Sequence, residues 1–250
     1  SVRGTPLEGN QWQVTVEVAE WPEIKEVRIV GNTVVKTDEI VKAIHDYITP
    51  GTVFTEKSVR PAADAIQALY TTKGYYAGPG LITDFGPMRE SPNTINIEID
   101  EVRVGTVSVE GVKTTRSSVM RRLIKTRTGD VFSPTKWTND LRRLINTQWF
   151  ESVKWVDADQ QEPDRVNLVA NVKETRTGQF NIGLQLDPQN SLAGILKLSD
   201  TNFRGTGQTV GFNFIQATRA SGPSVDFDYV NPFFDHKDTT LRASLYSRVI

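Results

Sequence analysis

The feature that most constrains the fold of this 250-residue chain is an internal repeat. The stretch EVRIVGNTVVKTDEIVKAI begins at Glu26, and its outline returns as TVSVEGVKTTRSSVMRRLI, which begins at Thr106. Each copy runs from alternating apolar residues through a glycine turn into a Thr- or Ser-rich helix start. Self-similarity at a fixed period indicates that one supersecondary unit is used more than once.

Two further landmarks fix the period of this repeat. Gly31 and Gly111 stand 80 residues apart (111 − 31). The segment PGTVF at residues 50–54 returns as TGDVF at residues 128–132, which is 78 residues later (128 − 50). A repeat of roughly this length is long enough for one sheet face to be buried under two helices, although it is close to the lower size limit for a stable domain.

Alternating strands that end in an acidic residue close each copy. They end at Glu101 and at Glu174, and a similar strand near the start of the chain ends at Glu20. We therefore expect four parts in the chain. Residues 1–21 are the C-terminal strand of a preceding module, residues 22–101 and 102–175 are two complete modules, and residues 176–250 are a separate tail.

The first module reads as β-α-α-β-β. Alternation predicts a strand at 27–29. Thr37 is placed to cap a first helix with acidic residues in its first turn. A second helix begins near Thr55, and Pro61 predicts that it starts late or kinks. The two closing strands are expected at residues 75–85 and 94–101.

The second module repeats the same plan. Ser133 and Pro134 have the residue types of a helix cap and a first helical residue, so a second helix is expected to begin there. Both modules therefore belong to the α+β class, with sheet and helices in one small unit. The other elements expected in this copy are a strand at 106–109, a helix at 117–125, and strands at 150–158 and 165–173.

The tail after Glu174 alternates with period two and shows no helical periodicity between residues 176 and 250. Five such stretches are separated by turn-forming segments, as in the first strands of an antiparallel membrane β-barrel. A soluble antiparallel sandwich has the same alternation and remains open at this point. One face is apolar and is made of Phe180, Ile182, Leu184, Leu186, Val210, Phe212, Phe214, Val225, Phe227 and Tyr229. The other face is small or polar and is made of Asn181, Gly183, Gln185, Gly211, Asn213, Asp226 and Asp228.

The composition excludes several classes of function. The net charge of −1 argues against a nucleic-acid binder, because phosphate neutralisation needs clustered excess Lys and Arg. The chain has no cysteine, and its histidines, His45 and His236, are far apart in sequence without a metal-binding or catalytic pattern around them. We therefore expect a protein that is not an enzyme and that has no cofactor and no metal. The basic segment at 120–127 is read as a solvated helix face, with contact to anionic lipid headgroups as the alternative.

Taken together, the modules and the tail resemble one known family. The segments IKEVRIVGNTVVKTDEI, TVSVEGVKTTRSSVM and INTQWFESVKW resemble POTRA (polypeptide-transport-associated) domains. DTNFRGTGQTVGFNF and YVNPFF resemble two turns of the barrel in BamA-like outer-membrane protein assembly factors. The first turn follows the second barrel strand and the second turn follows the fourth. The residues that match these turns are Asn202, Phe203, Gly205, Gly207, Asn231, Pro232 and Phe233.

The resemblance implies a location and a function. The barrel would lie in the outer membrane with the POTRA modules in the periplasm, or in the intermembrane space of a plastid envelope. The family folds and inserts other β-barrel proteins without a covalent reaction. Its partners would be unfolded outer-membrane proteins and membrane lipids, with periplasmic chaperones or accessory envelope proteins as further candidates and no nucleic acid.

Client strands are expected to pair with the strand that follows the helix pair in each module, because that strand is usually an edge. The candidate client-binding residues are Leu81, Ile82, Thr83, Phe85, Val153 and Trp155. For Trp155, packing against its own helices or the preceding module is the favoured alternative to contact with a client. The barrel's seam strand would carry Phe180, Ile182, Leu184 and Leu186.

Two other functions remain open beside assembly. A relative with the same architecture transports polypeptides, either as a two-partner secretion transporter or as a chloroplast envelope channel. The third strand ending, at Glu20, implies at least three modules and favours the assembly factor. A structural scaffold of POTRA modules without a barrel is the third reading.

Overall fold

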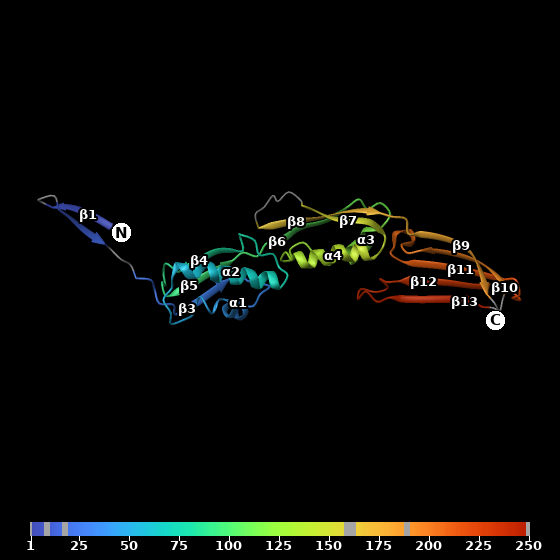
Figure 1. The fold of residues 1–250 in the computed structure, drawn as a ribbon, viewed down its shortest axis with the longest axis horizontal. Helices are drawn as coiled ribbons and strands as arrows, with labels where there is room; N and C mark the ends of the chain where they lie inside the picture. The colour runs from blue at the N-terminus through green and yellow to red at the C-terminus, as the bar shows by residue number, and fades with distance from the viewer. Residues whose placement is uncertain (1, 8–10, 17–19, 158–163, 188–190, 249–250) are drawn as a thin grey trace. The chain divides into compact units, whose positions relative to one another are not determined.

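The computed structural model of the chain describes all residues except 1, 8–10, 17–19, 158–163, 188–190 and 249–250. The described residues form two compact units, one within residues 1–102 and one within residues 103–250. Across these residues, no helix combines the length and the apolar character needed to cross a membrane. Figure 1 shows the order of the elements along the chain.

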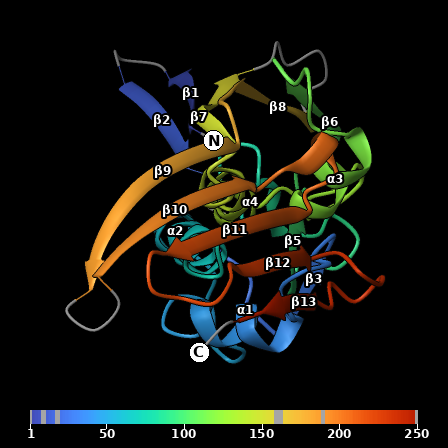
Figure 2. The same ribbon diagram turned by 90° about the vertical axis from the view of Figure 1, so that its right-hand side faces the viewer.

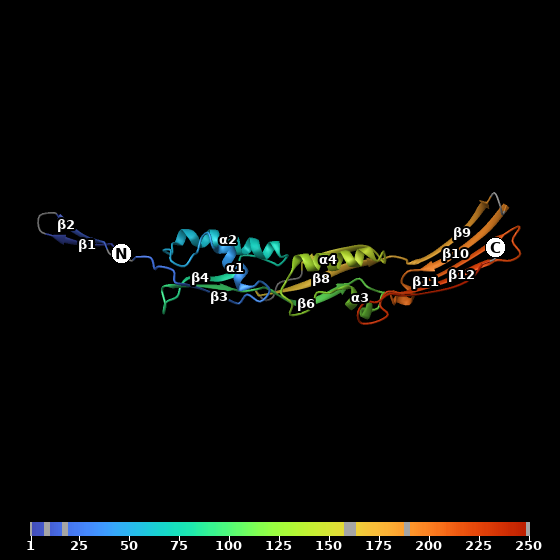
Figure 3. The same ribbon diagram turned by 90° about the horizontal axis from the view of Figure 1, so that it is seen from below.

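The first unit contains a hairpin and one complete module. The hairpin pairs β1 (Val2–Leu7) with β2 (Gln11–Val16) in antiparallel register. In the module, β3 runs parallel to β5, β4 runs antiparallel to β5, and the strand order is β3-β5-β4. Both helices lie on one face of this sheet (Figures 1 and 3). The module's elements are β3 (Glu26–Val30), α1 (Thr37–Ile44), α2 (Glu56–Thr72), β4 (Ile82–Pro87) and β5 (Thr94–Ile99).

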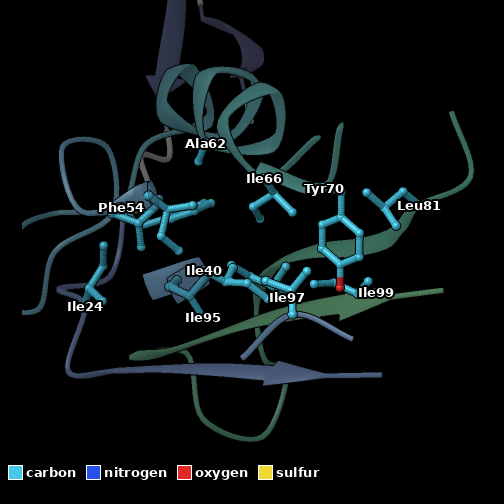
Figure 4. Packing of buried hydrophobic residues seen from close by; sticks show 13 residues of the cluster. Ile24, Ile40, Phe54, Ala62, Ile66, Tyr70, Leu81, Ile95, Ile97 and Ile99 are labelled. Atoms are coloured by element: carbon cyan, nitrogen blue, oxygen red, sulfur yellow. The ribbon is translucent and has the colours of Figure 1, made fainter. Parts of the chain in front are cut away.

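The core of this module lies between the helices and the central strand. Ile40 from α1, Ile66 from α2 and Ile97 from β5 are each fully buried, and Figure 4 shows them converging from the two layers. Burying one such side chain stabilises the fold by about 1.5–3 kcal/mol. Tyr70 is also fully buried, and its hydroxyl donates a hydrogen bond to Glu101 at 2.8 Å. The helix spacing and the strand alternation therefore meet in one core, as the sequence predicts.

The second unit begins with a module of the same design. Its sheet has the order β6-β8-β7, with β6 parallel and β7 antiparallel to β8. The Ser133 hydroxyl accepts a hydrogen bond from the N–H of Lys136 at 3.1 Å, and Pro134 is the first helical residue. The predicted cap of this helix is therefore confirmed. The elements are β6 (Arg103–Glu110), α3 (Ser117–Leu123), α4 (Pro134–Asn146), β7 (Phe150–Asp157) and β8 (Arg165–Glu174).

The tail folds into one antiparallel sheet of five strands, in which each strand pairs with its neighbours in sequence. Figure 2 shows these strands side by side in chain order. A short 3-10 helix, η1 (Phe203–Gly205), lies in the connection between the second and third strands. The strands are β9 (Gly178–Asp187), β10 (Ser191–Asp200), β11 (Thr209–Ala217), β12 (Ser224–Asn231) and β13 (Leu241–Ser247).

The register of this sheet confirms the two predicted faces. Direct partners across the strands form one apolar row, made of Phe180, Leu198, Phe212, Phe227 and Leu245. The opposite face pairs Gly211 with Asp228 and Asn213 with Asp226 in the same way. Because a one-residue slip would exchange the faces, this register is the one that keeps all the apolar residues together.

The structure corrects two expectations about the first helix pair. Thr37 is the first helical residue of α1 and Lys36 occupies the cap position. There the Glu39 carboxylate accepts a hydrogen bond from the N–H of Lys36 at 3.3 Å. Helix α2 runs without interruption across Pro61. The free energy gained by burying the apolar face of α2 offsets the cost of the hydrogen bond that proline cannot donate.

Two other boundaries also differ from the sequence prediction. The strand expected at 75–85 begins only at Ile82. In the preceding segment Gly78-Pro79-Gly80, the proline has no N–H to donate to a neighbouring strand, and the two glycines weaken strand formation. The helix expected at 117–125 ends at Leu123. The buried carboxylate of Asp140 accepts the N–H groups of Lys125 and Thr126 at 2.9 and 2.8 Å, and so holds the chain out of the helix.

Candidate functional site

The sheet of the first module has an open edge at β4, where client residues are predicted. Leu81 lies just before this strand and is only 2% exposed, so its side chain belongs to the core. Ile82 and Phe85 are half-buried and pack against the same core. Thr83 is exposed at an irregularity in the pairing with β5. The edge therefore presents mainly backbone groups, with one exposed hydroxyl among the four predicted residues.

The corresponding edge of the second module is β7. Val153 is half-buried, whereas Trp155 is 41% exposed. The Trp155 ring meets the buried ring of Phe132 edge to face, with 6.1 Å between the ring centroids. Packing within the module therefore fixes one side of the indole and leaves the other side open to solvent. A fixed aromatic ring beside an open strand edge is a suitable anchor for an extended peptide.

Strand β9 forms one edge of the five-stranded sheet described for the tail. Its predicted seam residues alternate along the strand, so they project from a single face, and all four are exposed. Their exposed fractions are 64% for Phe180, 73% for Ile182, 77% for Leu184 and 82% for Leu186. Contiguous exposed apolar surface of this kind marks contact with a lipid phase or with another protein.

The two glycines that reveal the repeat serve one structural purpose. Gly31 and Gly111 have φ angles of +87° and +86°. A Cβ added at Gly31 would lie 1.9 Å from the carbonyl oxygen of Ile99, and one added at Gly111 would lie 2.0 Å from that of Val172. Only glycine fits, because each turn has a positive φ and touches the backbone of the last strand.

The acidic residues that close each module hold the same turns in place. The Glu174 carboxylate accepts the backbone N–H groups of Lys113, Thr114 and Thr115 at 2.9, 2.7 and 2.8 Å. Glu101 does the same in the first module, where it accepts the N–H groups of Thr33 and Val34 at 2.9 and 3.1 Å. Each turn therefore ends in a cluster of donors that a carboxylate satisfies.

These hydrogen bonds shift the acidity of the closing residue. Burial alone would raise the pKa of Glu174, but bonds from the Thr115 hydroxyl and from the three N–H groups outweigh that effect. The pKa of Glu174 is therefore held below its ordinary value of 4.5. The sequence pattern indicates an acidic strand ending, but nothing in it indicates what the carboxylate binds.

The turn between β10 and β11 packs directly on the turn that Glu174 holds. The Asn202 amide donates to the Thr115 hydroxyl at 2.9 Å, and its carbonyl oxygen accepts the N–H of Gly207 at 2.8 Å. The N–H of Arg116 donates to the carbonyl of Gly205 at 2.9 Å. A Cβ at Gly205 would lie 2.0 Å from the carbonyl oxygen of Thr114. Gly205 therefore allows the two backbones to touch.

The other residues of the two turns lie close to the same contact. Phe203 is part-exposed at the start of η1, and Asn231 accepts the N–H of Phe233 at 3.0 Å through its side-chain oxygen. Pro232 lies between Asn231 and Phe233 in a turn that β12 leads into. The structure thus brings both sets of matched turn residues to the same side of the second module.

Part of the basic segment at 120–127 binds the turn that follows β12. Arg122 donates to the carbonyl oxygens of Phe233 and Asp235 at 3.3 and 2.5 Å, and its guanidinium lies 5.7 Å from the centre of the Phe233 ring. Lys125 pairs with Asp238 at 2.6 Å. Two of the basic residues therefore bind the sheet's own turn, and neither the solvated-face reading nor the lipid reading describes them. These partners are more than a hundred positions apart in the sequence, and no sequence pattern predicts that they meet.

The described residues show no arrangement typical of an enzyme. His45 and His236 are both exposed, each in a different unit. Within the described part of the chain, no group of three or more His, Asp or Glu side chains is placed to hold a metal ion.

Comparison with known proteins places these features in a family. Residues 22–101 and 102–175 each match the family described as POTRA, surface antigen variable number repeat. A Treponema pallidum (strain Nichols) protein, provisionally named an outer membrane protein assembly factor, is 27% identical over 217 residues. That alignment covers 83% of this chain and 25% of the relative, so the chain spans about a quarter of that relative's length.

Two solved structures share the fold. BamA from Haemophilus ducreyi lacking POTRA domains 1–3 is 23% identical with a TM-score of 0.56, over 90% of this chain and 42% of that chain. CdiB from Escherichia coli is 13% identical with a TM-score of 0.61, over 96% of this chain and 47% of that chain. Because the family matches cover more than half of its residues, this chain belongs to the POTRA family, with two POTRA domains that precede an antiparallel sheet.

Proposed function

We propose that this chain is part of an outer-membrane β-barrel assembly factor, with its POTRA modules in the periplasm and its five-stranded sheet in the outer membrane. The observation that carries the proposal is a pair of modules with open sheet edges, followed in one chain by a sheet with an exposed apolar face. The name of the Treponema pallidum relative and the fold shared with BamA support the same assignment.

The mechanism follows from the chemistry of a sheet edge. Strands β4 and β7 each pair on one side only, so unpaired N–H and C=O groups face outward. An unfolded outer-membrane protein in extended form satisfies these groups by adding a strand. Backbone pairing tolerates many sequences, which a general assembly factor requires. Around Trp155, the exposed ring adds apolar contact to the backbone bonds.

The sheet itself supplies the second half of the proposed function. The exposed apolar row on β9 contacts membrane lipid, while the outer backbone groups of β9 form one side of the seam at which a client strand is received. No covalent step and no cofactor is needed, because strand exchange conserves the backbone hydrogen bonds. Periplasmic chaperones and accessory envelope proteins are further partners of this scheme.

Hydrogen exchange tests the edge mechanism on the full chain in detergent micelles. Adding an unfolded outer-membrane protein is expected to slow amide exchange in β4 and β7. Strands β5 and β8 are already paired on both sides and are expected to stay unchanged. The proposal fails if the client binds and leaves both edge strands unprotected.

A matched pair of variants tests the aromatic anchor. Trp155→Ala is expected to weaken client binding several-fold, because the exposed face of the indole is lost. Ile145→Ala removes a comparably exposed apolar side chain from helix α4 and not from the edge strand β7, and is expected to leave binding unchanged. Equal effects of the two substitutions would remove Trp155 from the client surface.

The likeness to CdiB favours one second candidate. The chain shares the fold of CdiB with a TM-score of 0.61 over 96% of its length. A transporter that passes a polypeptide through the barrel, of the two-partner secretion or chloroplast envelope type, has the same order of modules and sheet. Loss of such a transporter would affect its own exported or imported polypeptides and not outer-membrane barrels in general.

A further inference from the structure

A groove on the second module lies between strand β6 and helix α3. Its volume is about 510 Å³, which is within the usual range for sites that hold small molecules. Val107 and Val109 of β6 form one wall and are half-buried. Met120 of α3 and Ile124, which follows the helix, form the other wall and are buried. The groove therefore offers an apolar surface that the module's own side chains do not fill.

The residues around this groove give it a positive charge. Arg121 and Arg127 line it, and its described lining residues include no aspartate or glutamate. The Arg127 guanidinium donates to three backbone carbonyl oxygens within residues 121–126, which hold it beside the apolar walls without neutralising its charge. The carboxylate of Asp130 accepts the backbone N–H of Arg127 and pairs with Lys136 at 2.6 Å. An anionic group is therefore the one that this site complements.

The first module does not carry these charges at the corresponding positions. Counted between the turn glycines of the repeat, the offset is 80 residues before the helix connection and 78 after it (111 − 31 and 129 − 51). Val41 then corresponds to Arg121, and Thr49 corresponds to Arg127. Because the first module folds to the same plan without the two arginines, the plan itself does not require them. Their role belongs to the module that directly precedes the sheet.

One end of the groove reaches the contact between the second module and the sheet. Thr115 lines the groove, and its hydroxyl accepts a hydrogen bond from the Asn202 amide at 2.9 Å. The opposite end lies at the start of β6, where the carbonyl of Val104 accepts the N–H of Gly129 at 2.8 Å. Arg127 lies two residues before that glycine. A hydrocarbon chain laid along the groove would therefore run from an arginine end toward the sheet.

We propose that this groove binds one acyl chain of an anionic phospholipid from the membrane that holds the sheet, with the lipid phosphate at Arg121 and Arg127. The inference rests on the proposed function, because such a lipid is within reach only if the exposed apolar face of the sheet lies in a membrane. A lipid in the adjoining leaflet has its headgroup outside the membrane and its chains directed inward. This polarity matches a groove whose arginines lie at the end away from the sheet.

The charge decides which lipid is bound. An acyl chain gains no hydrophobic free energy when it moves from a bilayer into an apolar groove, because its surroundings are equally apolar before and after. Filling the empty groove adds dispersion contacts for any lipid. Only the attraction of the arginines for the headgroup distinguishes one lipid from another, and a zwitterionic headgroup carries its own cation beside the phosphate.

Methyl NMR of the full chain in phosphatidylcholine nanodiscs tests the proposal, because the chain has only two methionines. Met120 lies in the groove, and Met88 follows β4 in the first module. The probe is phosphatidylglycerol with a nitroxide on one acyl chain. We expect it to broaden the Met120 signal and to leave Met88 sharp. Phosphatidylcholine with the same label should need about fivefold more lipid for equal broadening of Met120.

A matched pair of variants separates the groove from general electrostatics. Arg121→Gln is expected to remove most of the preference for the anionic lipid at Met120. Arg142→Gln removes the same charge from an exposed arginine on α4 that is not among the lining residues, and is expected to leave the preference unchanged. Both arginines are exposed, so neither substitution removes a core contact.

Three results would overturn the proposal. These are equal broadening of Met120 by the two labelled lipids, equal effects of the two variants, and a Met120 signal that stays sharp in labelled phosphatidylglycerol. If nitroxide-labelled stearate alone broadened Met120, the ligand would be a free fatty acid and not a membrane lipid.

The methyl groups of Ile182, Leu184 and Leu186 on β9 separate failure of this inference from failure of the proposed function. Broadening of these signals by both labelled lipids, with Met120 sharp, would remove only the groove and keep the sheet in the membrane. Sharp signals at both β9 and Met120 would remove the membrane placement of the sheet and the lipid site together.

Discussion

Close contact with the backbone of another strand, in addition to a positive φ, requires glycine at position 31. Comparing Gly31→Ala with Gly51→Ala separates these two requirements. Gly31→Ala places a Cβ 1.9 Å from a backbone carbonyl, so strand β5 must shift. Gly51 has the same positive φ, +90°, but a Cβ there meets nothing within 4 Å. We expect Gly51→Ala to lower the free energy of unfolding by about 1 kcal/mol through the φ cost alone. Gly31→Ala should cost at least about 2 kcal/mol more.

Urea unfolding followed by tryptophan fluorescence measures this difference. Trp21 meets the buried ring of Phe54 edge to face, with 5.8 Å between the centroids, and reports on the first module. Similar losses for the two variants would mean that the backbone approach at Gly31 relaxes without cost.

At this scale the sequence predicts part of the chemistry. The turns at Gly31 and Gly111 can be predicted from the repeat, because glycine is the residue that most readily adopts a positive φ. The hydrogen bonds of Glu174 and the pairing of Arg122 with Phe233 and Asp235 do not follow from it. These contacts join residues 59 to 113 positions apart, and only the folded chain brings them together.

The link between β8 and the turn before α3 depends on pH through Glu174. Its pKa is lowered in the folded chain, so the stabilisation is present above the unfolded value of about 4.5 and is lost as pH falls through the folded value. Glu174→Gln should therefore lower the exchange protection of the amides of Lys113, Thr114 and Thr115 at pH 7. The difference from the natural protein should shrink as pH falls through the folded pKa, which lies below 4.5, because the natural side chain then becomes neutral as well.

Glu151→Gln provides the matched control in the same sheet. Glu151 pairs with Lys173 at 2.7 Å, but both side chains are more than half exposed, so the pair contributes little. This variant should leave the three amides unchanged at every pH. A loss of protection in Glu174→Gln that persists undiminished at acidic pH would contradict the role of the carboxylate charge.

The elements themselves were predictable to different degrees. Periodicity located every strand of the tail and the Ser133 start of α4, because alternation and capping residues are local signals. The early end of α3 depends on the carboxylate of Asp140, which comes from a different helix. The late start of β4 reflects a Gly-Pro-Gly segment that the apolar pattern around it concealed. The predicted boundary of a helix or strand is therefore wrong where a residue distant in sequence, or a local glycine or proline, overrides the hydrophobic periodicity.

At the scale of the whole molecule, the two repeated modules account for the family assignment, and a sheet with two different faces follows them. The repeat predicts the modules, and the alternation predicts the sheet and its faces. The contact between the second module and the turns of the sheet was not predictable. The sequence motifs of these turns indicate loops, but they do not indicate the surface on which the loops pack. The two basic residues on that surface would otherwise be read as solvated or lipid-bound.

Depletion of the full-length protein in its own cells tests the central claim most directly, with folded outer-membrane barrel proteins quantified as the protein disappears. The proposed assembly role predicts that many unrelated barrel proteins decline together, while proteins of the inner membrane remain at normal levels. Re-expression of the natural sequence should restore them. Normal accumulation of the other barrel proteins, with loss of only one transported polypeptide, would contradict the assembly role and leave transport in its place.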